Sequence, residues 1–221
     1  SDELTTYMAN LLSQRKQEPQ EDLLSVLANA ESEGDKLTDR EIIATASFLL
    51  IAGFETTVNL LSVGTLVLLE NRGQLKQVAG NPELIPNLVE EALRVVSPVQ
   101  YTARTSDSDL QLSDGTKVRR GQTIALILTG ANRDPAVFED PNKFSVSREN
   151  ARRNIAFGYG AHHCIGAQLA RLEAETLWNE LLKSYPDVHS WQQIGAAKFR
   201  PGKTIRGLES MPMVLGSRAG S

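Results

Sequence analysis

The chain has 221 residues, of which 41% are hydrophobic and 23% charged, and its formal net charge is −4. This composition is typical of a globular protein, long enough for one large domain or two small ones. The excess of acidic residues argues against nucleic acid as a partner. The single cysteine excludes an internal disulfide, so a cytoplasmic location is expected.

The first third of the chain shows apolar residues at helical spacing. Two such stretches lie within residues 1–33, and Gly34 is expected to end the second. Thr38 and Glu41 form a capping-box pattern, because each side chain can satisfy a backbone donor at a helix start. The apolar residues that follow, to about Leu69, occupy nearly every side of the predicted helix. They predict a buried helix of roughly 30 residues, spanning about 45 Å.

A membrane span is the alternative for this long apolar helix. Glu55 stands at its centre, with Ser, Thr and Asn residues around it. A charge at that depth costs about 2.5–3.5 kcal/mol on insertion scales. The sequence therefore favours a central core helix and no membrane span.

Shorter elements are predicted in the rest of the chain. Helical patterns cover 71–79, 84–96 and 164–184, and alternating residues with Asp-Gly and Arg-Gly turn signals predict short strands within 99–128. The last of these helices carries its large apolar residues on one face: Ile165, Leu169, Leu172, Leu177 and Leu181. The predicted fold class is mainly α with a small β portion.

The single cysteine, Cys164, lies in the stretch "FGYGAHHCIG", residues 157–166. A lone cysteine is most often a small buried hydrophobic residue. A zinc site needs four spaced ligands, whereas "HHC" offers three adjacent ones, and the glycine spacing differs from that of a phosphate loop. A nucleophilic cysteine with His162 as its base stays open, because the third group that would orient the base cannot be identified from the sequence.

A metal-bound thiolate accounts for more of the loop. Cys164 stands at the predicted N-terminus of a helix, where unpaired N–H groups and the positive end of the dipole favour an anionic sulfur. Glycines allow the backbone to wrap closely around that sulfur. Such a protected thiolate suits the axial position of a haem iron.

The same stretch resembles the haem-binding loop of the cytochrome P450 family, whose pattern is F-G-x-G-x-H-x-C-x-G. The matching residues are Phe157, Gly158, Gly160, His162, Cys164 and Gly166. A match at six fixed positions in ten is specific, and a chance match is improbable.

Further motifs occur in the order typical of that family. The stretch "AGFETT" at 52–57 resembles the oxygen-activation motif of the family's central helix. Glu91 and Arg94 match its E-x-x-R motif, and Arg148 falls where an arginine completes a triad with them. Arg104 matches an arginine that pairs with a haem propionate. The resemblance covers essentially the whole chain and is to soluble bacterial members.

The resemblance implies a set of cofactor-binding residues. Cys164 would be the axial thiolate ligand of haem b (heme b, iron-protoporphyrin IX). His162 and Arg104 would bind the haem propionates, and Phe157 would pack against the haem and the sulfur. Asn154 stands where many soluble bacterial members carry histidine. The glycines implied to shape this loop are Gly158, Gly160 and Gly166.

The resemblance also implies roles in the reaction. Thr56 and Glu55 would deliver protons, and the small residues Ala52 and Gly53 would let oxygen come close to the helix. From the residues alone, the Thr56 hydroxyl could instead bond to a carbonyl one turn earlier. The triad of Glu91, Arg94 and Arg148 is implied to support the fold, with no part in the chemistry. The residues implied to face the substrate are Val96, Val99, Tyr101, Thr204 and Ile205.

The resemblance implies a haem-dependent monooxygenase that inserts one oxygen atom of O2 into an apolar small-molecule substrate, by hydroxylation or epoxidation. Electrons would come from a ferredoxin or flavoprotein donor that docks near the basic residues Lys143, Arg152 and Arg153. The resemblance is to the C-terminal half of a single P450 domain, with residues 1–215 as the domain portion and 216–221 as a linker or tail.

A second hypothesis belongs to another class of protein. The family's early helices, which cover the opposite side of the haem, have no counterpart among these residues. The chain is then a catalytically silent half-domain, a binding or assembly module that needs a partner. That partner would be a missing N-terminal half or a second copy of the chain.

Overall fold

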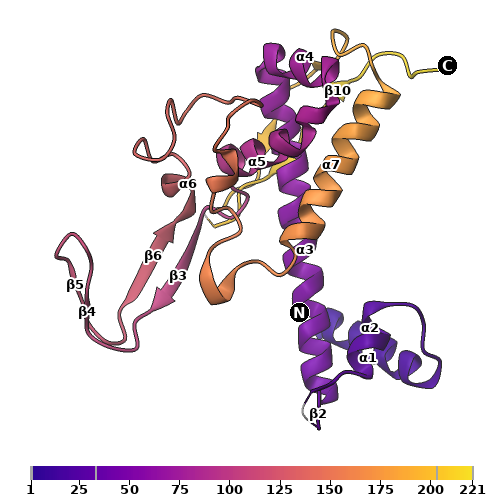
Figure 1. Ribbon diagram of the computed structural model, residues 1–221. Coiled ribbons are helices and arrows are strands. Elements are labelled where there is room, and N and C mark those ends of the chain that lie inside the picture. Colours follow the sequence, from indigo (N-terminus) through magenta and orange to yellow (C-terminus); the bar gives the residue numbers. More distant parts are fainter. Residues whose placement is uncertain (1, 33, 203, 221) are drawn as a thin grey trace. The chain divides into compact units, whose positions relative to one another are not determined.

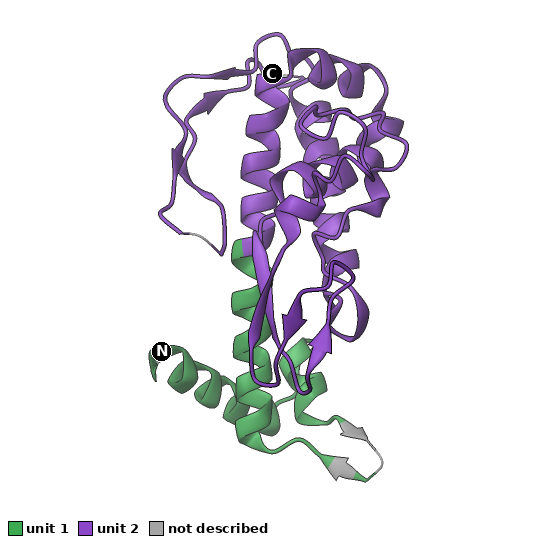
Figure 2. Ribbon diagram, turned by 90° about the vertical axis from the view of Figure 1, so that its left-hand side faces the viewer, with its two compact units in different colours: residues 1–55 green, residues 56–221 purple. Residues whose placement is uncertain are grey.

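The computed structural model of the protein describes residues 2–32, 34–202 and 204–220. Figure 1 shows its helices and its short strands. The chain divides into two compact units, residues 1–55 and 56–221 (Figure 2). The boundary falls inside the long helix α3 (Asp39–Glu70), between Glu55 and Thr56.

The first unit contains two helices ahead of α3, namely α1 (Asp2–Gln17) and α2 (Leu23–Ala28). Between α2 and α3 the chain forms the two short strands β1 (Glu31–Ser32) and β2 (Asp35–Lys36), which pair antiparallel. The small core of this unit is made by Leu12, Leu24 and Ile42.

The start of α2 is fixed by a capping carboxylate. The Asp22 carboxylate accepts a hydrogen bond of 2.8 Å from the N–H of Ser25 and pairs with Arg15. The hydrogen bond from Arg15, and after it the bond from the Ser25 backbone, lower the Asp22 pKa to about 2. An ionised Asp22 therefore stabilises the first turn of α2.

The predicted capping box at the start of α3 is confirmed. The N–H of Thr38 donates to Glu41 Oε2 over 2.8 Å, and the N–H of Glu41 donates to Thr38 Oγ1 over 3.3 Å. Among the described residues α3 is the one helix long and apolar enough to cross a membrane. Buried core helices of soluble proteins meet the same criterion of length and composition.

Burial along α3 differs from the sequence expectation. Leu60 and Leu68 are buried as predicted, whereas Phe48, Ile51 and Phe54 are exposed, Phe54 by 70%. Apolar residues on every side predict a helix that is packed against other elements all round. In the described chain, other residues pack against only part of α3. The prediction of a fully buried helix is therefore wrong for this central segment.

The main helices described in the second unit are residues 56–70 of α3 and three that follow it. These are α4 (Arg72–Gly80), α5 (Ile85–Val96) and α7 (Ala167–Ser184), with the 3-10 turn η1 (Pro82–Leu84) ahead of α5. The helices predicted over 71–79 and 84–96 are thus confirmed to within one residue at each end.

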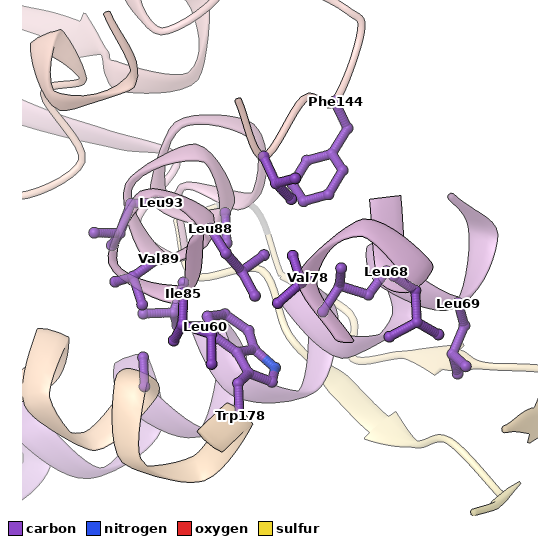
Figure 3. Packing of buried hydrophobic residues seen from close by; sticks show 14 of the residues in the cluster. Leu60, Leu68, Leu69, Val78, Ile85, Leu88, Val89, Leu93, Phe144 and Trp178 are labelled. Atoms are coloured by element: carbon purple, nitrogen blue, oxygen red, sulfur yellow. The ribbon is translucent and has the colours of Figure 1, made fainter. Parts of the chain in front are cut away.

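The core of the second unit lies among these helices. Figure 3 shows Leu60, Val78, Ile85 and Leu88 gathered beside the Trp178 ring. The buried residues labelled there include Leu60, Val78, Ile85, Leu88, Val89 and Phe144. The Trp178 indole N–H donates to Thr65 Oγ1 over 3.2 Å. A Cβ added to Gly64 would lie 2.8 Å from the Trp178 ring, so this glycine is what lets the indole lie against α3.

Helix α7 buries a different face from the one that its large residues suggest. Its buried residues are Ala167, Ala174 and Trp178. Ile165, just ahead of the helix, and Leu169 and Leu172 within it are exposed instead. Small residues allow α7 to pack closely, and one large indole fills the interface, so Leu169 and Leu172 are left outward. Leu181, of the same predicted face, is partly buried and packs against the core.

The β portion consists of two-stranded antiparallel ribbons. The longest pairs β3 (Tyr101–Thr105) with β6 (Thr123–Ile127), so that Tyr101 faces Ile127. The shorter strands are β4 (Leu110–Gln111) with β5 (Lys117–Val118), β7 (Gln192–Gln193) with β10 (Met213–Val214), and β8 (Lys198–Phe199) with β9 (Leu208–Ser210).

Short helical turns complete the second unit. They are α6 (Leu128–Ala131), η2 (Ala151–Arg153) and η3 (Gly160–His162). The predicted fold class, mainly α with a small β portion, is confirmed. Near the end of the described chain, the Ala219 N–H donates to the Ser184 carbonyl over 2.8 Å.

Candidate active site

The loop that carries Cys164 is closed by main-chain hydrogen bonds. The Cys164 N–H donates to the Phe157 carbonyl over 2.9 Å, and the Cys164 carbonyl accepts from the Ala167 N–H over 3.3 Å. The His163 N–H donates to the Gly160 carbonyl over 2.9 Å. The thiol itself is exposed. The backbone is therefore fixed while the sulfur stays accessible.

Two of the three loop glycines are required by backbone geometry. Gly158 has φ +72° and Gly160 has φ +74°, in the left-handed region that side chains rarely adopt. Gly166 differs, because its φ is −85° and an added Cβ would lie 3.9 Å from the Cys164 sulfur, at ordinary contact distance. The sequence pattern alone does not distinguish these two cases.

Cys164 lies just ahead of an uncapped helix start. Gly166 is the N-cap of α7, no side chain caps the helix, and its first turn contains no acidic residue. The unpaired N–H groups and the positive end of the helix dipole are thus left to interact with an anion nearby. This arrangement fits a thiolate that ligates a metal.

Arg104 and His162 are placed so that a carboxylate ligand could reach them. Arg104 lies on β3, half-buried, and donates to the neutral oxygens of Thr102 (3.2 Å) and Ala103 (2.8 Å). Among the described residues no carboxylate pairs with Arg104. His162 ends the turn η3 and is exposed. Both residues therefore fit partners for the propionates of haem b.

Glu55 and Thr56 are adjacent in the middle of α3, and both are half-buried. Ala52 and Gly53, one turn earlier, are exposed, and a Cβ added to Gly53 would meet no atom within 4 Å. The helix surface at Gly53 is therefore open.

The residues Glu91, Arg94 and Arg148 lie in contact. Glu91 Oε2 is 2.7 Å from Arg94 Nε, and Glu91 Oε1 is 3.1 Å from Arg148 Nε. The side chains of Glu91 and Arg94 are wholly buried. The two guanidinium groups also donate to the main-chain carbonyls of Asn132, Glu139, Asp140, Pro141 and Lys143. The irregular segment ahead of the cysteine loop is thereby tied to α5.

A second carboxylate network, centred on Glu90, was not predicted from the sequence. Glu90 is buried and pairs with Arg171 of α7, whose guanidinium carbon lies 4.7 Å from the centroid of the Phe157 ring. Asn154 Nδ2 also donates to Glu90, over 2.9 Å. The adjacent glutamates of "EEALR" were the available signal, because a helix rarely buries two carboxylates without partners.

The described residues offer no alternative metal centre. No group of three or more His, Cys, Asp and Glu side chains in that part of the chain is arranged to hold a metal ion. The exposed thiol of Cys164, the helix start beside it and the unpaired charge of Arg104 fit a thiolate-bound haem.

Comparisons with known sequences and structures show the family of the chain. The family profile "Cytochrome P450" matches residues 2–81 and 80–188. The chain belongs to the cytochrome P450 family.

Two curated bacterial proteins and one solved bacterial structure illustrate the similarity. "Putative cytochrome P450 140" of Mycobacterium tuberculosis is 42% identical to this chain, over 95% of this chain and 48% of its own length. The "Biotin biosynthesis cytochrome P450" of Bacillus subtilis is 40% identical, over 95% of this chain and 52% of its own. The solved structure of the Bacillus subtilis cytochrome P450 PksS matches with a TM-score of 0.90 and 39% identity. That match covers 97% of this chain and 55% of PksS.

The chain thus spans about half the length of the curated relatives it matches. Haem and monooxygenase chemistry are properties of the family, and the roles of individual residues in this chain are proposals.

Proposed function

We propose that the chain carries the thiolate-ligand portion of a haem-dependent monooxygenase. The observation that carries the proposal is Cys164, an exposed thiol with a fixed backbone, ahead of the uncapped start of α7. Such a sulfur would suit the role of a ligand of the iron of haem b.

The cofactor would supply the redox chemistry. When bound, thiolate-ligated haem b would supply the chemistry by which one oxygen atom of O2 is inserted into an apolar small molecule, by hydroxylation or epoxidation, while two electrons and two protons reduce the other oxygen atom to water. Cys164 would hold the iron through its sulfur, and Arg104 and His162 would bind the two propionates. Phe157 would pack beside the sulfur and limit the access of water to it.

The proton-delivering residues are Thr56 and Glu55. The Thr56 hydroxyl would donate a proton to the reacting oxygen. The Glu55 carboxyl would then return a proton to the Thr56 hydroxyl. Their neighbours Ala52 and Gly53 would leave room on the helix surface, which is open at Gly53. Glu91, Arg94 and Arg148 would hold the segment that leads into the cysteine loop and take no part in the chemistry.

The substrate would lie against side chains that the fold brings together. Val99 and Ile205 form an antiparallel bridge, and the Thr204 hydroxyl donates to the Tyr101 hydroxyl over 2.9 Å. These contacts would make one wall of an apolar pocket.

The electron donor would be a ferredoxin or flavoprotein in the cytoplasm. The exposed residues Lys143, Arg152 and Arg153 offer positive charge to an acidic partner. Nucleic acid is not an expected partner.

The visible spectrum tests the haem assignment. The purified chain is loaded with haem, reduced and treated with carbon monoxide, and the difference spectrum is recorded. A Soret band at the thiolate-ligated position is expected, and the variant Cys164→Ser, which cannot supply a thiolate, should lack it. A loaded wild-type chain without that band would overturn the assignment.

A catalytically silent module is the second candidate. Exposed apolar residues beside Cys164 favour this candidate, namely Ile165 (89% exposed), Leu169 and Leu172. An exposed apolar face of this kind is typical of a surface that binds another protein or a ligand. A stably folded, haem-free monomer would support the silent module. A haem-loaded chain whose spectrum shifts with apolar ligands would support the enzyme.

A further inference from the structure

Arg171 joins α5 to the cysteine loop. Its Nε lies 2.8 Å from Glu90 Oε1, and its guanidinium carbon lies 4.7 Å from the centroid of the Phe157 ring. Glu90 is buried, whereas the Arg171 side chain is 25% exposed. The arginine is thus held at one end by a carboxylate, and its flat face covers the aromatic ring that opens the loop.

The same carboxylate also holds the backbone that leads into the loop. Asn154 Nδ2 donates to Glu90 Oε2 over 2.9 Å, and Asn154 Oδ1 accepts from the Ala156 N–H over 3.1 Å. Glu90 therefore acts on Phe157 in two ways: through Arg171 over the ring, and through Asn154 on the residue just before it. Asn154, at the position where relatives were expected to carry histidine, has a defined partner.

Phe157 in turn holds Cys164. The Cys164 N–H donates to the Phe157 carbonyl over 2.9 Å. The residues between them include Gly158 and Gly160, which gain the most backbone freedom when contacts are lost. A loop of this composition keeps one shape only if its ends are anchored.

We infer that Arg171, held by Glu90, is a positioning residue that fixes Phe157 and, through the Phe157 carbonyl, the backbone of Cys164. The mechanical part of this inference concerns the chain alone. Its consequence for the iron ligand rests on the proposed function.

The single cysteine makes the mechanical part directly measurable. Selective 15N labelling of cysteine and tryptophan gives one cysteine amide signal, from Cys164, together with the indole signals of Trp178 and Trp191. The Trp178 indole N–H is bonded inside the core and reports global opening. Hydrogen exchange of the cysteine amide, relative to the Trp178 indole, therefore measures the loop separately from the fold.

In the haem-free chain, Arg171→Gln should speed exchange of the Cys164 amide about fivefold to tenfold relative to the Trp178 indole, because a cation–π contact and its ion pair are both lost. Arg171→Lys keeps the charge but not the flat face, and should fall between the wild type and Arg171→Gln. The control Lys183→Gln removes an exposed charge from the same helix and should change neither signal.

The double variant Glu90→Gln/Arg171→Gln leaves no buried charge unpaired, and replaces Arg171→Gln if that variant does not fold. Unchanged exchange at Cys164, or equal acceleration at Cys164 and Trp178, would overturn the inference. An Arg171→Lys variant as fast as Arg171→Gln would overturn the role of the charge.

A haem-loaded sample tests the consequence for the ligand. If the wild type gives the thiolate Soret band with carbon monoxide, Arg171→Gln should weaken that band in favour of one typical of a lost thiolate, at equal haem content. An unchanged band would overturn the consequence for the ligand. Failure of the wild type to give the band would refute the proposed function, and the exchange result on the haem-free chain would stand independently.

Discussion

Glu90 and Glu91 are neighbours on α5, and they hold different parts of the molecule. Consecutive side chains on a helix point about 100° apart. Glu91 therefore meets Arg94 and Arg148, which tie down the irregular segment, while Glu90 meets Arg171 and Asn154 beside the cysteine loop. Both arginine partners of Glu91 have nearly or wholly buried side chains, whereas the Arg171 side chain is partly exposed.

The difference in burial between their partners determines how much Glu90 and Glu91 each contribute to the free energy of unfolding. Removing one member of a buried charge group leaves an uncompensated charge away from water. A partly exposed partner can be resolvated, so its loss costs less. We therefore expect Glu91 to govern global stability, and Glu90 to govern the local order of one loop.

The largest effect is expected from Glu91→Gln. The buried guanidinium of Arg94 loses its counter-ion, which should lower the free energy of unfolding by about 3–5 kcal/mol. Urea titration followed by the fluorescence of the buried Trp178 and Trp191 measures this change. Glu180→Gln, at an exposed position on α7, serves as the control. A loss below about 1 kcal/mol, the range of exposed pairs, would contradict the prediction.

Arg148→Gln should have the next largest effect. Arg148 donates to Glu91 and to the carbonyls of Glu139, Asp140 and Lys143, so the variant loses several bonds from a charged donor. The expected loss is about 1.5–3 kcal/mol in the same titration. If this loss exceeds that of Glu91→Gln, then Arg148 rather than the carboxylate is the centre of the triad.

Glu90→Gln should cost less, about 1 kcal/mol, because Gln can still accept from Asn154 and the exposed side of Arg171 can turn to water. Urea titration measures the loss, and exchange at Cys164 should change more than the unfolding free energy. A loss as large as that of Glu91→Gln would remove the distinction between the two carboxylates.

The smallest effect belongs to a half-buried carboxylate, Asp22. Its pKa is lowered from 3.8 to about 2 in the folded state, chiefly by the hydrogen bond from Arg15. A depressed pKa means that its stabilisation is present above the unfolded value and is lost as the pH falls through the folded value. The stability difference between wild type and Asp22→Asn should therefore be constant above pH 4 and shrink between about pH 4 and 2. Urea titrations across this range measure it, and a constant difference would contradict the prediction.

Local signals in the sequence predicted much of the fold. The capping box of Thr38 and Glu41 and the helices α4 and α5 needed only short-range information. The buried face of α7 could not be predicted, because it depends on the fit of Trp178 against Gly64, which are far apart in the sequence. Large apolar residues indicate that a helix face is suited to burial, but they do not show which face is buried in the folded chain.

In the candidate site, too, residues at local spacing could be predicted from the sequence, and contacts between distant residues could not. The loop motif identified Cys164 and the glycines of its loop, since their spacing is local. The pairing of Glu90 with Arg171 joins residues 81 positions apart, and no helical spacing relates them. The roles of Cys164, Thr56 and Arg104 toward haem stay predictions until the spectrum is measured.

The accessible sulfur of Cys164 has a practical consequence for any measurement of assembly. Two chains can join through their lone exposed thiols by air oxidation, without any complementary surface between them. A dimer that disappears when a reductant is added is then a product of thiol chemistry. A dimer that persists under reductant, or in Cys164→Ser, reports recognition between folded surfaces.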